Sequence, residues 1–258
     1  MTDLLSVLGP IAQTLLLTTL VVFFRVGAAM AVLPAFGERT IPQRIRLVLA
    51  MSLTVILVPM LDNIPTFPEQ AYQLALLIMG ETVIGLSFGL VLRLFVMTLQ
   101  IAGSIAAQST SLSQIFGGSN MVEPQPAIGH LFVIGGLAIA VLNDLHLKLI
   151  EAFLITYEIF PAGTGLTGAA LAGWGVKRIS YAFALGFTLS APFMIAAFIY
   201  NIALGVINKA MPQLMVTLVG APAITAAGLG LLLITTPLLL ELWRAAMDVA
   251  LANPFGDL

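Results

Sequence analysis

The sequence predicts an all-α polytopic membrane protein, and three observations support this class. Of the 258 residues, 60% are hydrophobic and only 9% are charged. The mean hydropathy is +1.08, and long apolar runs with no strand pattern or fixed-period repeat fill the chain. A typical soluble domain carries about 25% charged residues, so this composition excludes a soluble enzyme, a nucleic-acid-binding protein and a disordered chain.

Eight apolar runs are the candidate helices. They cover residues 11–33, 47–61, 71–92, 94–107, 127–142, 145–160, 179–208 and 214–240. A helix needs about 20 residues to span about 30 Å of hydrocarbon, so several runs are short and the last two are long for a simple crossing. Pro192 and Pro222 lie in these two long runs and give each a place to break, because proline removes a backbone hydrogen bond.

Two stretches between the runs are expected to be loops, and basic residues predict the orientation of the chain. Residues 108–126 and 161–176 are rich in glycine, proline and small polar side chains. Arg44 and Arg46 follow the first apolar run, whereas the loop after the second run carries no base. The positive-inside rule therefore places residues 34–46 in the cytoplasm.

The sequence offers little for catalysis or metal binding. Cysteine is absent and there are two histidines, His130 and His146, which is too few for a zinc site. Residues 163–168 match the Gly-x-Gly-x-x-Gly pattern, but they follow a helical run and Pro161 rather than a strand, so we interpret them as a loop. Ser87 with a histidine as base would suggest an intramembrane hydrolase, yet nothing places either histidine beside it. We expect no enzyme activity, no cofactor and no metal.

Three charged residues lie deep in apolar sequence: Arg25, Glu81 and Arg93. An unpaired charge in the bilayer centre costs about 2.5–3.5 kcal/mol or more, so each needs a partner or a water-filled cavity. Glu81 paired with Arg25 or with Arg93 is the simplest arrangement. Arg93 has the alternative of extending its side chain to the membrane interface.

Small residues recur at helical spacing and predict packing faces. They are Gly85 with Gly89, Ala182 with Gly186 and Ser190, and Ala223 with Ala227. Such stripes let helices approach closely, either within one chain or against another subunit. The sequence favours neither over the other.

Residues 108–126 allow two interpretations. A lipid-exposed loop is not viable inside the bilayer, whereas one that lines a cavity or lies in water is. Glycines and small polar residues suit a pliant plug, in which Ile115, Phe116 and Met121 would seal a constriction. The residues by themselves favour the simpler alternative, a solvated external loop.

Several short motifs follow one another along the chain. They are Phe24-Arg25-Val26-Gly27, Pro34-Ala35-Phe36-Gly37, Ile41-Pro42-Gln43-Arg44-Ile45-Arg46, Gly80-Glu81, Gln100-Ile101-Ala102-Gly103, Phe160-Pro161-Ala162-Gly163, Leu189-Ser190-Ala191-Pro192, Met211-Pro212-Gln213-Leu214 and Gly220-Ala221-Pro222. In order and spacing this series resembles the FliR family of flagellar and type III secretion export-gate proteins. The resemblance extends from about residue 24 to about residue 222, nearly the whole chain.

The resemblance implies a non-enzymatic subunit of the flagellar protein export gate. Kinked helical hairpins would pack into a hetero-oligomeric gate in the bacterial inner membrane, at the flagellar basal body. The implied partners are FliP, FliQ, FlhB and FlhA, together with exported flagellar proteins and membrane lipid. Residues 1–160 would form a FliP-like region and residues 161–258 a FliQ-like helical hairpin.

The resemblance also places the loop 108–126 inside the pore, which reverses the preference for an external loop. The plug residues would be Gln108, Ser111, Ser113, Ile115, Phe116, Gly117, Gly118, Asn120 and Met121. Arg25, Glu81 and Arg93 would hold buried contacts. The alternative hypothesis is a small-solute secondary transporter with its site at helix breaks near Pro192 and Pro222.

Overall fold

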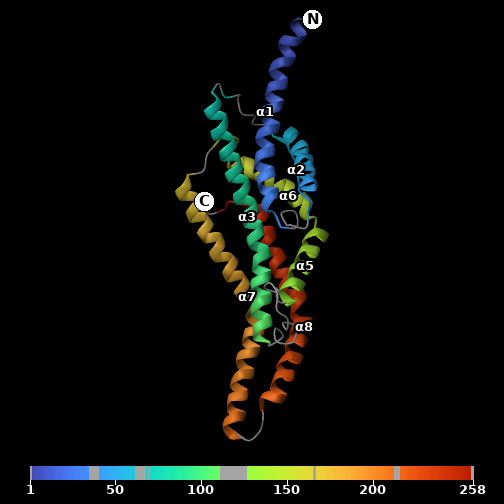
Figure 1. Cartoon of the computed structure of the whole chain (residues 1–258), viewed down its shortest axis with the longest axis vertical. Helices are drawn as coiled ribbons and strands as arrows, with labels where there is room; N and C mark the ends of the chain where they lie inside the picture. Colours follow the sequence, from blue (N-terminus) through green and yellow to red (C-terminus); the bar gives the residue numbers. More distant parts are fainter. Residues whose placement is uncertain are drawn as a thin grey trace. The chain divides into compact units, whose positions relative to one another are not determined.

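The computed structural model describes residues 2–34, 41–61, 68, 70–110, 127–164, 167–211 and 216–256. Within these ranges the chain is helical and contains no β-strand (Figure 1). The helices are α1 (Thr2–Val32), α2 (Gln43–Leu57), the short 3-10 helix η1 (Val58–Met60), α3 (Ala71–Ser109), α5 (Ala127–Leu142), α6 (Leu145–Ile159), α7 (Gly168–Ala210) and α8 (Val216–Ala252). The all-α class predicted from the composition is confirmed.

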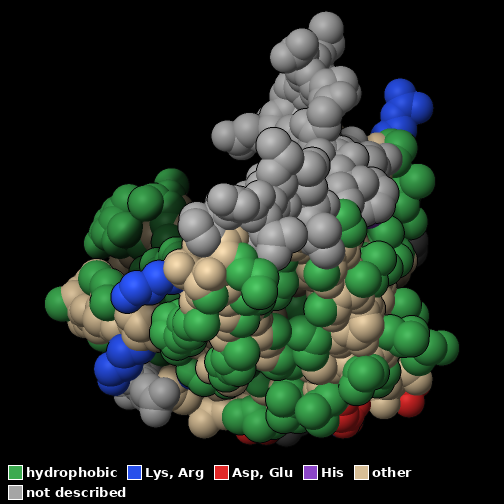
Figure 2. Space-filling model, turned by 90° about the horizontal axis from the view of Figure 1, so that it is seen from below, with side chains coloured by type: hydrophobic (Ala, Val, Ile, Leu, Met, Phe, Trp, Pro, Cys, Tyr) green, Lys and Arg blue, Asp and Glu red, His purple; other side chains and the backbone are tan. Residues whose placement is uncertain are grey.

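Among the described helices, five are long and apolar enough to cross a membrane. These segments are Ala12–Val32, Gln43–Met60, Ala71–Ser109, Gly168–Ala210 and Pro222–Ala252, and α5 with α6 adds a sixth if the pair is counted as one interrupted span. Hydrophobic side chains make up most of the described surface in Figure 2. Leu16 and Phe198, for example, are 70% and 67% exposed. A surface of this kind suits contact with lipid or with other membrane helices rather than with water.

Three helices are longer than the apolar runs indicated. α3, α7 and α8 contain 39, 43 and 37 residues, or about 58, 65 and 55 Å at 1.5 Å per residue, well beyond about 30 Å of hydrocarbon. Arg93 does not interrupt α3, which joins two of the expected runs. The stretch 161–176 was expected to be a loop, but α7 already begins at Gly168. Gln108, expected in a loop, is an exposed residue of the last turn of α3.

The breaks expected at Pro192 and Pro222 do not interrupt the helices. α7 continues through Pro192, and α8 continues through Pro222 and Pro237. Each proline removes one backbone hydrogen bond, while unwinding the helix would release several backbone groups with no water to bind them. A continuous helix is therefore the better solution at both positions.

Contacts divide the chain into two compact units. The first comprises residues 1–94, 144–178 and 247–258, and the second comprises residues 95–143 and 179–246. Helices α3, α7 and α8 contribute residues to both units. The boundary that the sequence predicts, between residues 160 and 161, lies between α6 and α7 and within the residues of the first unit.

In the first unit, α3 packs on α1 through two glycines of the predicted stripe. A Cβ atom at Gly85 would lie on the carbonyl oxygen of Arg25, and one at Gly89 would lie 2.6 Å from the carbonyl oxygen of Ala29. A side chain of any size would push the two helices apart. This stripe is therefore used for packing within the chain.

In the second unit, a buried tryptophan joins α8 to α3. Trp243 is 0% exposed, and its Nε1–H donates to the carbonyl oxygen of Phe95 at 2.7 Å. Gly136 of α5 faces the same indole, where a Cβ atom would lie 3.2 Å from the ring. Gly186, the centre of another predicted stripe, is buried against Ile101 of α3.

The third predicted stripe, on α8, lies on an exposed face of the described chain. Ala223 and Ala227 are exposed, whereas Ile224 and Gly228 are buried, and Gly228 packs against Thr110. Within the described chain, this part of α8 therefore packs through Ile224 and Gly228, and the predicted stripe is left for the other alternative, packing against another subunit. In an apolar helix both faces look alike in the sequence, because lipid is as apolar as the protein interior.

Candidate functional site

The most polar buried site of the described chain is an ion pair between α1 and α3. Arg25 and Glu81 are 0% and 1% exposed. The guanidinium group binds the carboxylate through two parallel hydrogen bonds, Nε to Oε2 at 2.6 Å and Nη2 to Oε1 at 3.1 Å. This two-pronged geometry is the strongest arrangement available to an arginine and a carboxylate.

The remaining hydrogens of the Arg25 guanidinium are used on α6 and on the residue that follows it. Nη1 donates to the carbonyl oxygen of Thr156 at 3.0 Å and approaches its Oγ1 at 3.3 Å, and Nη2 donates to the carbonyl oxygen of Phe160 at 2.9 Å. A guanidinium group has five N–H hydrogens, and these five contacts give each of them an acceptor. The buried cation is therefore fully satisfied by the protein.

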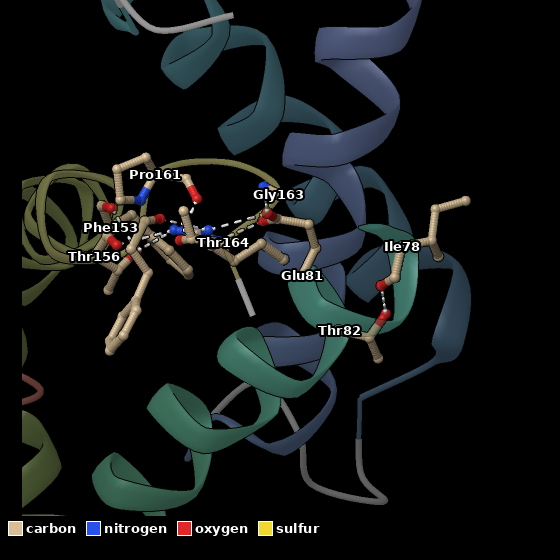
Figure 3. A network of polar contacts seen from close by, with 10 residues as sticks. Ile78, Glu81, Thr82, Phe153, Thr156, Pro161, Gly163 and Thr164 are labelled. Atoms are coloured by element: carbon tan, nitrogen blue, oxygen red, sulfur yellow. Dashed lines mark hydrogen bonds and ion pairs between the residues drawn. The ribbon is translucent and has the colours of Figure 1, made fainter. Parts of the chain in front are cut away.

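The acceptor side of the pair is held by the turn between α6 and α7. The backbone N–H of Gly163 donates to Glu81 Oε1 at 3.1 Å. Gly163 has φ +86°, a left-handed conformation that glycine adopts without strain. Figure 3 shows Glu81 facing this turn, with Thr156 on the other side of the network. One ion pair thus ties together α1, α3, α6 and the turn that leads into α7.

An aromatic ring covers the cation. The guanidinium carbon of Arg25 lies 3.6 Å from the centroid of the Tyr157 ring, which is a cation–π contact. The ring occupies a side of the guanidinium group that hydrogen bonds cannot reach, and it excludes water from the pair. Both effects strengthen the interaction in a low-dielectric site.

The C-terminal segment closes over the same turn. Phe255 is 2% exposed, and its ring packs against Phe160 and Trp174 with centroid separations of 5.1 and 5.0 Å. Arg178 Nη2 donates to the carbonyl oxygen of Gly256 at 2.5 Å. The ring of Phe160 therefore contacts Phe255, while its carbonyl oxygen accepts a hydrogen bond from Arg25.

Not every predicted site residue belongs to this network. Arg93 is exposed on α3, so it is not a buried contact, and an interfacial position suits it. Pro192 and Pro222 lie inside continuous helices. The plug residues from Ser111 to Met121 lie outside the described residues.

The described residues also offer no support for hydrolysis or metal binding. The Ser87 hydroxyl donates to the carbonyl oxygen of Val83 in its own helix at 2.7 Å, and among the described residues no hydrogen bond joins it to a histidine. Within the same ranges, no group of three acidic or histidine side chains is placed to hold a metal ion.

Four members of the network were missed as site residues: Thr156, Tyr157, Phe160 and Gly163. Thr156, Phe160 and Gly163 bind through backbone atoms, which no residue type reveals. The motif Phe160-Pro161-Ala162-Gly163 was the available signal, because it stood out in the series of motifs.

Together the fold and the site define a class: a helical integral membrane protein in which buried charge joins helices. The sequence pattern of the family described as bacterial export proteins, family 1, matches residues 16–250. The chain belongs to this family, and the resemblance seen in the motifs is confirmed.

Relatives from distant bacteria agree with this assignment. The chain is similar to the flagellar biosynthetic protein FliR of Caulobacter vibrioides, with 32% identity over 234 residues that cover 88% of this chain and 93% of the relative. The FliR protein of Bacillus subtilis is 28% identical over 79% of this chain and 80% of its own length. That of Aquifex aeolicus is 28% identical over 95% and 92%.

Proposed function

We propose that this chain is a subunit of the flagellar type III protein export gate in the bacterial inner membrane, at the flagellar basal body. The observation that carries this proposal is the family match over residues 16–250, since it extends along nearly the whole chain. The role is structural and conductive rather than enzymatic. The buried charges support it, because every hydrogen of the guanidinium group is used in joining helices.

The subunit would consist of two parts, a FliP-like region at residues 1–160 and a FliQ-like hairpin at residues 161–258. The boundary coincides with the turn after α6, where Gly163 binds Glu81. In this arrangement the ion pair fixes the start of the second part to the first. Its function would be to keep α1, α3 and α6 in register while other segments move.

The moving segment would be the plug, residues 108–126. Its glycines, Gly117 and Gly118, would give the chain freedom to move, and Ile115, Phe116 and Met121 would seal the closed pore by excluding water. Gln108 marks the end of α3, from which the plug would extend. The rigid junction and the pliant plug would together make one part of a closed protein-conducting channel.

Assembly with FliP and FliQ tests whether this chain is a subunit of the export gate. The three proteins would be coexpressed, solubilised in mild detergent and weighed by native mass spectrometry. We expect one discrete complex that contains all three chains. A lone chain or a homo-oligomer, in the presence of folded FliP and FliQ, would contradict the proposal. FlhB and FlhA, the further expected partners, would then be added to the complex.

The plug has its own test. Deleting four residues within 108–126 should let small ions leak through the assembled gate in planar bilayers, because the seal is shortened. The matched control is a deletion of the same length within residues 62–67. Unchanged conductance in the first variant, with the complex intact, would contradict the assignment of the plug.

No observation favours the small-solute transporter. Such a site is typically built from discontinuous helices, whose free ends bind the solute and its coupled ion. α7 and α8 instead continue through Pro192 and Pro222. The family match also points to protein export.

A further inference from the structure

A pocket of about 330 Å³ opens between α1, α2 and α3 in the first unit. Its wall on α1 includes Phe23, Phe24 and Gly27, and its wall on α2 includes Leu47 and Arg46. The volume is in the range of sites for small organic molecules. The pocket is separate from the ion pair, because neither Arg25 nor Glu81 lines it.

The interior of the pocket suits hydrocarbon. Gly27 provides the room, since a Cβ atom there would meet only the ring of Phe23, at 3.8 Å. Thr82, the residue contributed by α3, donates its hydroxyl to the carbonyl oxygen of Ile78 at 2.7 Å, so this hydrogen is already used. The phenylalanines and Leu47 complete an apolar wall.

The rim of the pocket carries polar and positive groups on one side. Gln43 and Arg46 both line it from the first turn of α2, and Arg46 is half-buried. Arg44 lies beside them, exposed and outside the lining. The positive-inside rule assigns this end of α2 to the cytoplasmic side, where the leaflet contains anionic lipid. Basic pockets between membrane helices on that side bind phosphate headgroups.

We propose that this pocket binds one anionic phospholipid, with an acyl chain against Phe24, Gly27 and Leu47 and the phosphate at Arg46. The combination of an apolar interior and a cation at one rim matches a molecule that is hydrocarbon at one end and anionic at the other. The lipid would fill the space between α1 and α2 and hold α2 against α1. This inference goes beyond protein export and does not depend on it.

The test is a lipid titration of the full-length chain in mild detergent, followed by native mass spectrometry. Phosphatidylglycerol and phosphatidylcholine with identical acyl chains are the two probes. We expect phosphatidylglycerol to bind about fivefold more tightly, the ratio that one basic side chain near the membrane surface provides. Arg46→Gln should remove this preference. Arg44→Gln, the control of equal charge, should retain it.

A second pair of variants tests the apolar part. Gly27→Leu places a side chain in the pocket and should weaken the binding of both lipids. Gly80→Leu is the control, because a Cβ atom at this helical glycine meets no atom within 4 Å and Gly80 does not line the pocket. Equal lipid binding by the Gly27 and Gly80 variants would overturn the proposal. An equal loss of preference in the Arg44 and Arg46 variants would do the same.

Crosslinking in the assembled complex distinguishes a lipid in the pocket from a protein segment in the pocket. A photoreactive amino acid at Leu47, which is 51% exposed, would be activated in the complex coexpressed with FliP and FliQ. A phospholipid adduct would support the proposal, and an adduct to a neighbouring subunit would refute it. Failure of the gate to assemble would leave the titration of the single chain as the deciding result, so the two proposals can fail separately.

Discussion

Removing one partner of the Arg25–Glu81 pair should destabilise the protein more than removing both. In Glu81→Leu, the guanidinium group loses two charge-assisted hydrogen bonds, at 2.6 and 3.1 Å, and stays buried as an unpaired cation. Two such bonds at about 1.5–3 kcal/mol each give about 3–6 kcal/mol. Broken buried pairs generally cost about 3–5 kcal/mol, so we expect a loss in free energy of unfolding within that range.

The double variant Arg25→Met, Glu81→Leu should recover much of this loss, because no buried charge remains. Replacing a buried pair by apolar residues of similar volume is often close to neutral. Here the recovery is incomplete, since the carbonyl oxygens of Thr156 and Phe160 and the N–H of Gly163 lose their partners. We expect a coupling energy of about 2–3 kcal/mol between the two substitutions.

The assay is reversible unfolding in mixed detergent micelles, followed by far-ultraviolet circular dichroism. Glu241→Gln is the control, because Glu241 pairs with Arg244 on the surface of α8 and is 56% exposed in its side chain. This exposed pair should contribute little to the free energy of unfolding, because solvent screens it. The single variants Arg25→Met and Glu81→Leu are compared with the double variant. If their losses in free energy of unfolding add to within about 0.5 kcal/mol, the assigned pairing is refuted.

Three further substitutions probe the packing of the helices. Gly85→Leu should lower the melting temperature sharply, because its Cβ atom would collide with the backbone of α1 and overpacking costs about 1–3 kcal/mol or more. Gly80→Leu is the control, and equal melting temperatures of the two variants would contradict close packing of α3 on α1. Trp243→Phe keeps an aromatic ring but loses the hydrogen bond to the carbonyl oxygen of Phe95, which should lower the free energy of unfolding by about 1–2 kcal/mol in chemical unfolding. An unchanged free energy of unfolding would argue against that bond. Phe255→Ala should cost about 3–5 kcal/mol and shift the fluorescence of Trp174, and an unchanged spectrum would contradict the C-terminal packing.

The composition predicted the class of fold, and the cost of buried charge predicted that Glu81 pairs with Arg25 or with Arg93, of which the structure shows Arg25. Both predictions rest on large energies that no detail of packing can reverse. The contacts to Thr156 and Phe160 could not be predicted in the same way. They use backbone carbonyl oxygens 131 and 135 residues away, and every residue type carries a carbonyl oxygen.

The errors concern helix ends. Arg93 separated two runs in the hydropathy pattern, yet one charge at an exposed position does not end a helix. Pro192 indicated a break, but only one backbone hydrogen bond is lost there. On α8, Ala223 of the predicted stripe is exposed and Gly228 is buried, and the sequence did not show which of the two faces packs within the chain. A polar face normally settles that choice, and here neither face is polar.

The long-range contacts of Arg25 also impose an order on synthesis. Its partners Glu81 and Phe160 lie 56 and 135 residues further along the chain. At about 5–20 residues per second, translation reaches them about 3–11 s and about 7–27 s after Arg25 is made. Until Glu81 is made, the nascent first helix carries an unpaired cation, which is costly in the bilayer. An incomplete product that ends before residue 81 therefore differs from the finished protein by an unpaired charge in its first helix.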